Sequence, residues 1–221
     1  MIQPPAPSTQ PPVLSPQSLV PGLLFVISAP SGAGKTSISR QLLALQPALR
    51  QSVSYTTRPM RAGEQDGVDY HFVSCARFDA MVAEGAFAEW AQVHGNRYGT
   101  ARTTLEEASA AGYDILLDID VQGAAQLRAS GVGGVHIFIL PPGMAELRSR
   151  LAGRGTDSAE VIERRMQNAT TEIREAVHFD YLVINDDLAR AVATVQAIMR
   201  AEHARVAHAL PGIPAEFGLK L

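Results

Sequence analysis

The chain has 221 residues, of which 46% are hydrophobic and 19% are charged, and its formal net charge is −3 at pH 7. This length and composition predict one globular domain with a proper core and room for small inserted subdomains. The mild negative charge disfavours general binding to nucleic acid, because a phosphate backbone requires clustered positive charge.

The targeting signals of membrane and secreted proteins are not expected here. The apolar runs are too short and too broken to cross a bilayer. No Lys or Arg precedes a hydrophobic stretch near residue 1, which disfavours a secretory signal. Cys75 is the only cysteine, which excludes an internal disulfide and a cysteine-rich zinc site and fits a reducing cytoplasm.

Residues 1–20 form a proline-rich lead that we expect to be a flexible tail, because prolines lack backbone donors and the residues between them bury little. A continuous apolar run, LLFVIS, follows at 23–28 and predicts a parallel strand covered on both faces. Residues 36–47 then place apolar side chains along one helical face, and Pro47 ends the helix. Strand, glycine-rich turn and helix in this order are the context that a phosphate-binding loop requires.

The turn between that strand and that helix reads APSGAGKT, close to the phosphate-loop pattern G-x-x-x-x-G-K-[ST]. Its glycines let successive backbone N–H groups point at phosphate oxygens, and the start of the helix adds partial positive charge. Lys35 is expected to reach the β- and γ-phosphates of a nucleotide, and the Thr36 hydroxyl to ligate Mg²⁺. Ala29 replaces the first glycine of the pattern, which costs little where the backbone is in an ordinary region. The candidate phosphate-binding residues are Ala29, Pro30, Ser31, Gly32, Ala33, Gly34, Lys35 and Thr36.

A second segment, residues 54–72, narrows the choice among GTPases, ATPases and kinases, which the loop alone does not separate. It belongs to a region between Ser52 and Gly99 in which alternating VDYHFV and glycine-rich turns predict a small, partly antiparallel insert. Arg58 and Arg61 follow a predicted strand, and Tyr70 lies on the alternating one. Two guanidinium groups and a tyrosine hydroxyl suit a second, smaller phosphate group, because the arginine fork matches phosphate geometry.

Later apolar runs are candidates for three further buried strands: 114–119, 135–140 and 181–186. Helical stretches separate them, which is typical of a parallel α/β sheet. Asp118 and Asp120 are two residues apart at the end of one run, so their side chains project from the same face of the strand. At the carboxyl end of a parallel strand, that face borders the ligand crevice. Asp118 is placed to hold a metal-bound water or to orient Lys35, and Asp120 to meet a nucleoside. Their division of roles stays open.

A second insert is expected at 151–166, where Arg154 lies between two glycines and Asp157 is placed to cap a following helix. The last helix is predicted to continue to His208. His203 would lie five residues earlier on that helix and on another face, which disfavours a metal site formed by the two histidines.

These motifs together resemble those of the guanylate kinase family, over roughly residues 21–206. The resemblance rests on the phosphate loop, on S-x-T-T-R-x-x-R-x-G-E from Ser54, and on EWAQVHGNRYGT (89–100), LDIDVQG (117–123) and GRGT (153–156). It implies an α/β fold with a P-loop NTPase-like parallel sheet core flanked by helices and with inserted GMP-binding and lid subdomains. The implied boundaries are a core of 21–52, 105–144 and 167–206, a GMP-binding insert of 53–104, a lid of 145–166, a tail of 1–20 and a C-terminal extension of 207–221.

The same resemblance implies Mg²⁺-dependent transfer of the γ-phosphoryl group of ATP to GMP or dGMP. The implied catalytic residues are Lys35, Arg58, Arg154 and Arg165, with Arg148 as an outside candidate for the lid. Metal contacts are implied for Thr36 and, through water, for Asp118, and the adenine side for Asn185. The residues implied for the monophosphate are Arg58, Arg61, Tyr70 and Tyr98, and those for guanine are Ser54, Glu89 and Thr100, supported by Glu64 and Asp120.

The residues implied for the base agree with the chemistry of guanine. Its N1–H and N2 amine are adjacent donors that one carboxylate accepts side by side, and adenine offers neither. Hydroxyls at Ser54 and Thr100 are expected to donate to guanine O6. Two rivals stay open: a kinase for another small acceptor, such as AMP or a ribose bisphosphate, and a non-catalytic guanylate-kinase-like module that binds phosphopeptides. A monomer and a homo-oligomer both stay open as well.

Overall fold

The central layer of the molecule is a five-stranded sheet in the order β2-β7-β1-β8-β9, in which each pairing is parallel. The computed structural model describes residues 20–93, 95–153 and 158–220. The strands are β1 (Leu24–Ser28), β2 (Leu49–Gln51), β7 (Asp114–Asp118), β8 (Val135–Leu140) and β9 (Tyr181–Ile184). Because they run in one direction, their carboxyl ends meet at one edge, where ligands bind in open parallel sheets. The predicted α/β class with a parallel sheet is confirmed.

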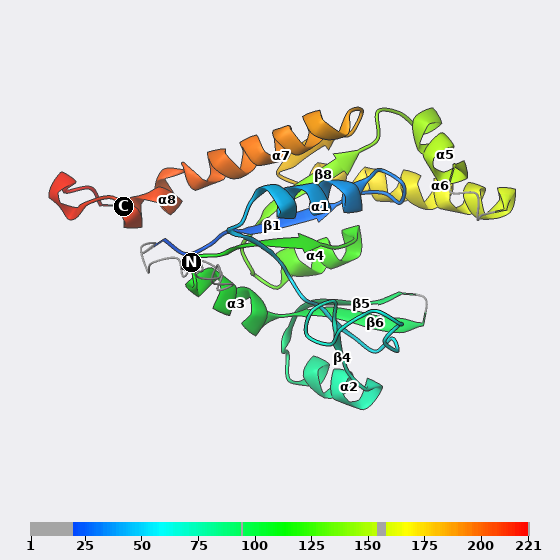
Figure 1. Cartoon of the computed structure of the whole chain (residues 1–221), viewed down its shortest axis with the longest axis horizontal. Helices are drawn as coiled ribbons and strands as arrows, with labels where there is room; N and C mark the ends of the chain where they lie inside the picture. Colours follow the sequence, from blue (N-terminus) through cyan, green and yellow to red (C-terminus); the bar gives the residue numbers. More distant parts are fainter. Residues whose placement is uncertain (1–19, 94, 154–157, 221) are drawn as a thin grey trace, which may run out of the picture.

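Helices cover both faces of this sheet (Figure 1). α1 and α7 pack on the face that contains Phe25 and Ile27, and α3 and α4 pack on the face that contains Val26. This alternation along β1 is expected for a strand with a helical layer on each side. None of the described helices is both long and apolar enough to cross a membrane. The four helices are α1 (Lys35–Leu45), α3 (Arg102–Ala110), α4 (Val121–Ala129) and α7 (Leu188–His203).

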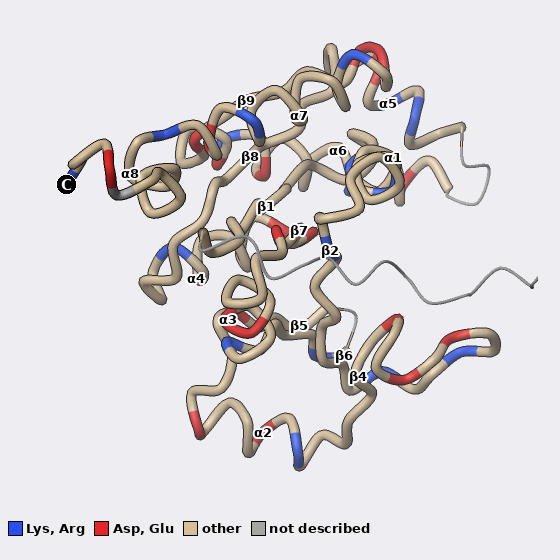
Figure 2. Tube along the Cα trace, turned by 60° about the vertical axis from the view of Figure 1, so that its left-hand side comes forward, with Lys and Arg blue, Asp and Glu red and all other residues tan. Residues whose placement is uncertain are grey.

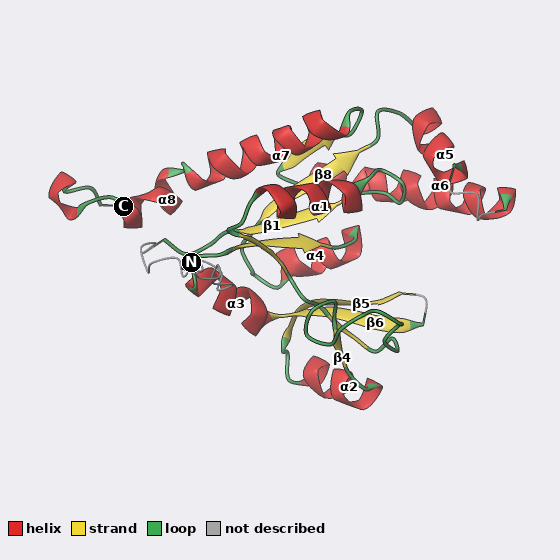
Figure 3. Cartoon of the chain, viewed as in Figure 1, coloured by secondary structure: helices red, strands yellow, loops and turns green. Residues whose placement is uncertain are grey.

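A second sheet of four strands, in the order β4-β3-β6-β5, lies to one side of the first (Figure 3). Its strands and helix are β3 (Tyr55–Thr56), β4 (His71–Phe72), α2 (Cys75–Ala83), β5 (Phe87–Val93) and β6 (Asn96–Ala101). β6 is antiparallel to β3 and β5, whereas β3 and β4 are parallel, so the segment is partly antiparallel as predicted. Phe78, Met81 and Phe87 form a small core of its own.

α4 connects the central sheet to this second sheet. The side-chain oxygen of Gln126 accepts a hydrogen bond from the backbone N of Trp90 in β5, at 3.1 Å. Asp120 caps α4, because its carboxylate accepts a hydrogen bond from the backbone N of Gly123 at 2.8 Å. α4 therefore holds the two sheets together at the edge where the strands of the central sheet end.

α5 (Met144–Ala152) and α6 (Ala159–Arg174) pack against each other. They lie near the carboxyl ends of the central strands, on the side away from the second sheet (Figure 1). Their contact buries four apolar side chains: Leu147, Leu151, Met166 and Ala169. The 3₁₀ turn η1 (Glu175–His178) then leads from α6 to β9.

The residue that caps α6 differs from the one predicted. Ser158 is the cap, and its hydroxyl accepts a hydrogen bond from the backbone N of Val161 at 3.4 Å. The predicted cap, Asp157, lies outside the described residues. Ser158 directly precedes the first helical residue, which is the position from which a short side chain reaches the unpaired N–H groups of the first turn.

The prediction of one helix continuing to His208 is wrong, because α7 ends at His203. Arg205 is extended, with φ −62° and ψ 136°, and a short helix α8 (Val206–Ala209) begins after it. This break turns the chain, so His208 Nε2 lies 3.1 Å from His203 Nδ1 and the two rings meet after all. His203 Nε2 lies 2.7 Å from Asp114 Oδ2 at the start of β7, which fastens the C-terminal segment to the central sheet.

The segment after α8 lies beside the first described residues. It contains two 3₁₀ turns, η2 (Leu210–Gly212) and η3 (Ala215–Phe217). A Cβ atom on Gly212 would lie 2.8 Å from the Cγ2 methyl of Val20, so the chain enters and leaves the fold at neighbouring points.

Candidate active site

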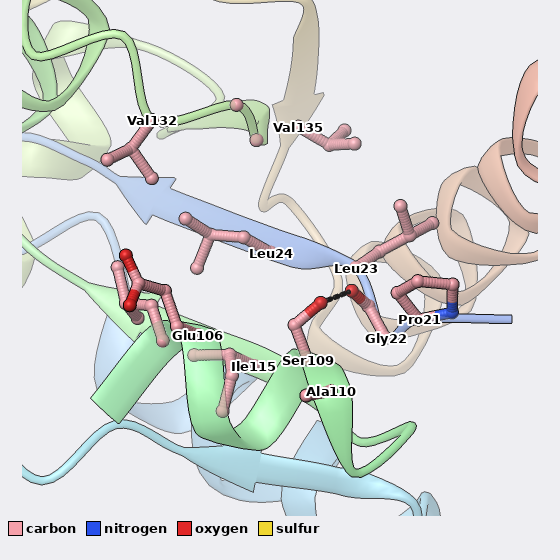
Figure 4. A pocket seen from close by; sticks show the side chains of 13 residues that line it. Pro21, Gly22, Leu23, Leu24, Glu106, Ser109, Ala110, Ile115, Val132 and Val135 are labelled. Carbon is pink, nitrogen blue, oxygen red and sulfur yellow. Dashed lines mark hydrogen bonds between the residues drawn. The ribbon is translucent and has the colours of Figure 1, made fainter. Parts of the chain in front are cut away.

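Two cavities in the described part of the chain differ in position and chemistry. The larger, about 690 Å³, lies at the amino ends of the strands and is lined mostly by apolar side chains such as Leu24 and Val135 (Figure 4). One of its few polar groups, the Ser109 hydroxyl, already donates to the Gly22 carbonyl at 2.8 Å. The smaller, about 290 Å³, lies at the carboxyl ends and is lined by Lys35, Ser54, Tyr70, Glu89, Ala91, Val93, Tyr98, Asp118, Ile119 and Asp120. Seven residues predicted from sequence line the smaller cavity, which is therefore the candidate site: Lys35, Ser54, Tyr70, Glu89, Tyr98, Asp118 and Asp120.

The phosphate loop lies between β1 and α1 and has the backbone geometry of an anion site. Gly32 and Gly34 have φ of 91° and 97°, in the left-handed region that favours glycine. No side chain caps the start of α1, which leaves its first N–H groups able to meet an anion. Ala29 is buried against the core, so the methyl group that replaces the first glycine of the motif has a packing role.

Asn185 stabilises the phosphate loop through a hydrogen bond to its backbone. Its side-chain Nδ2 donates to the Ala33 carbonyl at 2.7 Å, and a Cβ atom on Gly34 would lie 2.3 Å from that nitrogen. The Arg150 guanidinium in turn donates to the Asn185 carbonyl at 3.0 Å. Asn185 was predicted on the adenine side of the nucleotide, and in the structure its amide shapes the loop.

Lys35 is held at the end of β7. Its Nζ lies 2.5 Å from Asp118 Oδ1 and donates to the Ile119 carbonyl at 2.9 Å. The second oxygen of Asp118 accepts from the Ser39 hydroxyl on α1 at 3.2 Å. Of the two roles left open for Asp118, this geometry favours the orientation of Lys35. The acidic residues at the end of β7 lie close to the middle of the molecule (Figure 2).

Glu89 lines the cavity from a buried position, and Thr100 lies behind it. They face each other across β5 and β6, with exposed fractions of 6% and 0%. The Thr100 hydroxyl donates to Glu89 Oε1 at 2.6 Å, and burial raises the pKa of the Glu89 carboxyl. Thr100 was expected to donate to guanine O6. Its proton is instead directed at Glu89, so Thr100 acts here by orienting the carboxylate.

Arg58, Glu64 and Arg61 form a linked group beside the cavity, next to its lining residue Tyr70. The Arg58 guanidinium donates to both oxygens of Glu64, at 2.7 and 3.1 Å, and lies 5.4 Å from the centre of the Tyr70 ring. The backbone N of Arg61 donates to Glu64 at 2.8 Å. The Arg58 hydrogen bonds lower the pKa of the Glu64 carboxyl. Glu64 therefore organises the segment that carries both predicted arginines.

The arginines predicted for the lid lie on α5 and α6 or between them. Arg148 makes an ion pair with Glu163 at 2.8 Å, which links the two helices. Arg165 lies on α6. Arg154 and the next two residues of the GRGT motif, Gly155 and Thr156, lie outside the described residues.

Sequence reasoning missed one carboxylate beside the phosphate loop. Glu172 on α6 accepts a hydrogen bond from the backbone N of Ser31 at 3.3 Å. Burial raises the pKa of Glu172, and Asp120 raises it further while Lys35 opposes the shift. Glu172 is one of several polar residues on an amphipathic helix, and no motif near it in the sequence distinguishes it from the others.

Comparison with known proteins assigns the chain to the same family that its sequence motifs resemble. The family model described as guanylate kinase matches residues 22–202 of this chain. The chain belongs to the guanylate kinase family. The match covers both sheets and the residues that line the smaller cavity, so the resemblance inferred from the separate motifs is confirmed.

Individual relatives cover most of the chain. The guanylate kinase of Syntrophotalea carbinolica is 62% identical over 184 residues, which is 83% of this chain and 88% of that protein. The guanylate kinase of Geobacter sulfurreducens is 52% identical over 198 residues, covering 90% of this chain and 98% of that one. The crystal structure of guanylate kinase from Anaplasma phagocytophilum has a TM-score of 0.66 and 33% identity, covering 86% and 90% of the two chains.

Proposed function

We propose that this chain is an enzyme that transfers the γ-phosphoryl group of ATP to GMP, giving ADP and GDP. The observation that carries the proposal is a single cavity with two chemically different ends. Lys35, from the phosphate loop, lines one part of it, and the buried Glu89 carboxylate, which accepts a hydrogen bond from Thr100, lines another. A triphosphate and a guanine monophosphate are the ligands that complement these two ends. Relatives that are named guanylate kinase support the same reading.

In the proposed reaction, a phosphate oxygen of GMP attacks the γ-phosphorus of ATP, and the bond from that phosphorus to the β-bridging oxygen breaks. No side chain becomes a nucleophile, so the protein contributes alignment and positive charge. Lys35 follows the β- and γ-phosphates and neutralises charge that develops there. Arg58 and Arg61, with the hydroxyls of Tyr70 and Tyr98, hold the GMP phosphate in line.

The acceptor end selects the base through complementary hydrogen bonds. Glu89 accepts from guanine N1–H and the N2 amine, Ser54 faces the base, and Asp120 stands at its edge. With adenine, the buried Glu89 carboxylate would lose both donors, which is the arrangement by which a polar site discriminates by about 10⁴-fold or more. dGMP keeps all of these contacts and is proposed as a second acceptor.

Oxygen donors suited to Mg²⁺ lie at the start of α1 and the end of β7. Thr36 is exposed in the first turn of α1, and the partly buried Asp118 carboxylate is paired with the neighbouring Lys35. Hydroxyl and carboxylate oxygens, with water, are the ligands that Mg²⁺ takes beside phosphates, so the residues fit the ion. Bound there, Mg²⁺ would neutralise phosphate charge and polarise the transferring group. Thr36 is the proposed direct ligand, and Asp118 acts through water while it orients Lys35.

The proposed roles divide the chain into parts. The core comprises 21–52, 105–144 and 167–206, the acceptor insert 53–104 and the lid 145–166. The lid arginines Arg154 and Arg165 cover the ATP phosphates once both substrates are bound, which neutralises charge and excludes water. A cytoplasmic location is proposed as well, because the single exposed thiol, Cys75, suits a reducing compartment.

A panel of nucleotides tests the proposal directly. ATP and Mg²⁺ are incubated with GMP, dGMP, AMP or a ribose bisphosphate, and ADP formation is followed in a coupled assay. We expect turnover with GMP and dGMP, and kcat/KM for AMP lower by about 10⁴-fold. Equal turnover with AMP would contradict the assignment of Glu89. Absence of turnover with each acceptor, together with no ATP binding in calorimetry, would favour a non-catalytic module.

A further inference from the structure

We infer that Gly123, in the first turn of α4, determines the choice of base, because its missing side chain leaves the space that the Glu89 carboxylate occupies. This inference rests on the proposed function and deepens it. Gly123 does not line the cavity, and its place in the motif LDIDVQG gives no chemical role by itself. Its effect is exerted on the position of another residue.

The spacing between the two residues is too small for a side chain at position 123 unless the Glu89 carboxylate moves. A Cβ atom at position 123 would lie 2.9 Å from Glu89 Oε2, a distance that Cβ atoms essentially never show in proteins. The same Cβ would lie 3.4 Å from two carbon atoms of Ile119, so it has no second direction in which to relax freely. A methyl group here would therefore move the carboxylate by a few tenths of an ångström.

The backbone does not require glycine at this position. Gly123 is a helical residue, and it is not among the glycines with a left-handed φ. In a helix, glycine is less favourable than alanine by up to about 1 kcal/mol. A glycine that weakens its own helix needs another reason, and the close approach of Glu89 Oε2 supplies one.

The Glu89 carboxylate cannot move away from position 123 without weakening contacts that it already makes. The side chain is buried, and its other oxygen holds the Thr100 hydroxyl at 2.6 Å. The strand on which it stands is also fixed to α4, because Gln126 accepts from the backbone N of Trp90, the residue after Glu89. Gly123 and Gln126 are three apart and so share one face of α4. One residue anchors the strand and the other leaves room for its carboxylate.

Displacement of Glu89 Oε2 is expected to weaken recognition of the guanine base and to leave ATP binding unchanged. Guanine N1–H and the N2 amine require two carboxylate oxygens side by side, so a displaced carboxylate keeps one of the two hydrogen bonds in good geometry. The atoms nearest to a Cβ at position 123 belong to Glu89 and Ile119, and neither Lys35 nor another residue of the phosphate loop is among them. The expected signature is a loss toward GMP with no loss toward ATP.

The test is Gly123→Ala in the full chain, with kcat and KM measured for GMP, AMP and ATP. We expect kcat/KM for GMP to fall about tenfold, because small misplacements of a recognition group have effects of this order. The preference for GMP over AMP should fall by the same factor, and KM for ATP should change less than twofold. The melting temperature should change by only a few degrees, since the higher helix propensity of alanine offsets part of the steric cost. An unchanged kcat/KM for GMP would overturn the inference.

Gly133→Ala is the matched control. A Cβ atom at that position meets no atom within 4 Å, and the residue lies at the larger cavity, away from the candidate site. Its kinetic constants should equal those of the unaltered chain. If Gly133→Ala lowered kcat/KM for GMP as much as Gly123→Ala does, the effect would be a general cost of losing a glycine and the inference would fail.

A double variant separates a steric effect from a structural one. Glu89→Asp withdraws the carboxylate by one C–C bond, about 1.5 Å, and so makes room for a methyl group at position 123. Adding Gly123→Ala to Glu89→Asp should cost less than twofold in kcat/KM, against about tenfold in the presence of glutamate. Simple additivity of the two changes would overturn the inference. Failure of the unaltered chain to phosphorylate GMP would instead overturn the proposed function, and GMP affinity by calorimetry would still test Gly123.

Discussion

The phosphate end and the acceptor end of the candidate site are built in opposite ways. The phosphate loop is one continuous stretch, 29–36, in which two left-handed glycines position backbone N–H groups beside the side chains of Lys35 and Thr36. The acceptor end is assembled from side chains that lie far apart in the sequence, such as Ser54, Glu89 and Asp120. Several of them are held by a neighbour, as Thr100 holds Glu89.

The difference has a physical consequence for tolerance to change. A site made of backbone groups depends on local dihedral angles and accepts Ala29 in place of glycine. A site made of side chains depends on the length and charge of every partner, including residues such as Gly123 that touch no ligand. We therefore expect substitutions to divide into those that act on ATP and those that act on GMP.

The largest effect is expected for Lys35→Ala, which removes the only side-chain cation predicted to follow the β- and γ-phosphates from the loop. We expect kcat to fall about 10³-fold or more, because charge stabilisation is the main contribution to phosphoryl transfer. The fold should persist, with a change in melting temperature of a few degrees. Steady-state kinetics and circular dichroism measure the two quantities.

Arg40→Ala is the control for that substitution, since Arg40 is exposed on the same helix. It should leave kcat within twofold. Activity of Lys35→Ala equal to that of the control would show that the loop does not bind the transferring phosphates.

Glu89→Gln tests the acceptor end with nearly no change in shape. The amide presents one acceptor and one donor, so its NH₂ group faces a guanine donor and one hydrogen bond is lost. We expect kcat/KM for GMP to fall about 10²-fold, with KM for ATP unchanged. Glu107→Gln on the exposed side of α3 is the matched control. An equal fall in ATP affinity would contradict the assignment of Glu89 to GMP recognition alone.

Arg58→Lys asks whether the planar fork is needed beside the cavity. Lysine keeps the charge but cannot hold both oxygens of Glu64. We expect KM for GMP to rise about tenfold and kcat to change less. Initial-rate measurements over a range of GMP concentrations give both constants. Wild-type behaviour of the lysine variant would mean that charge alone is sufficient.

The dependence of GMP recognition on pH should follow Glu89. Burial raises the pKa of this carboxyl, so protonation begins at a higher pH than for an ordinary glutamate. Protonation replaces an acceptor by a donor, and KM for GMP should therefore rise several-fold as pH falls through that pKa. The GMP phosphate also titrates, so the measured quantity is the ratio of KM between the unaltered chain and Glu89→Gln at each pH. A constant ratio would argue against ionised Glu89 as the guanine acceptor.

The smallest effect is expected for Ala29→Gly, which restores the usual first residue of the loop motif. Kinetic constants should stay within twofold, because the loop acts through its backbone. The free energy of unfolding should fall by about 1 kcal/mol, since a buried methyl group is lost and the unfolded chain gains freedom. Urea denaturation measures the stability. A large gain in kcat would show that alanine strains the loop.

The sequence predicted the parts of the fold whose causes are local. β1, β7 and β8 are continuous apolar runs because each is covered on both faces. β9 is an apolar run as well, although Leu182 and Ile184 on this edge strand are exposed. The positions of all four were predicted within about a residue or two. β2 was missed because it is a three-residue edge strand with two exposed side chains, LRQ, and carries no apolar pattern. The break at Arg205 was missed because neither glycine nor proline marks it.

The motifs predicted which residues belong to the site, but they did not predict which contacts those residues make with one another. The donation from Thr100 to Glu89 depends on the register between β5 and β6, which no local pattern reveals. The approach of Gly123 to Glu89 depends on how α4 packs against β5. Contacts between elements that are distant in sequence arise from packing, and only the three-dimensional structure supplies them.

The contact between Val20 and Gly212 bears on how the molecule can be re-engineered. Since the polypeptide enters and departs at adjoining points, a short linker would join them without spanning the substrate cleft. A circular permutant with fresh termini between α4 and β8, at Gly133, would keep the phosphate loop and the acceptor strands intact on the same closed scaffold.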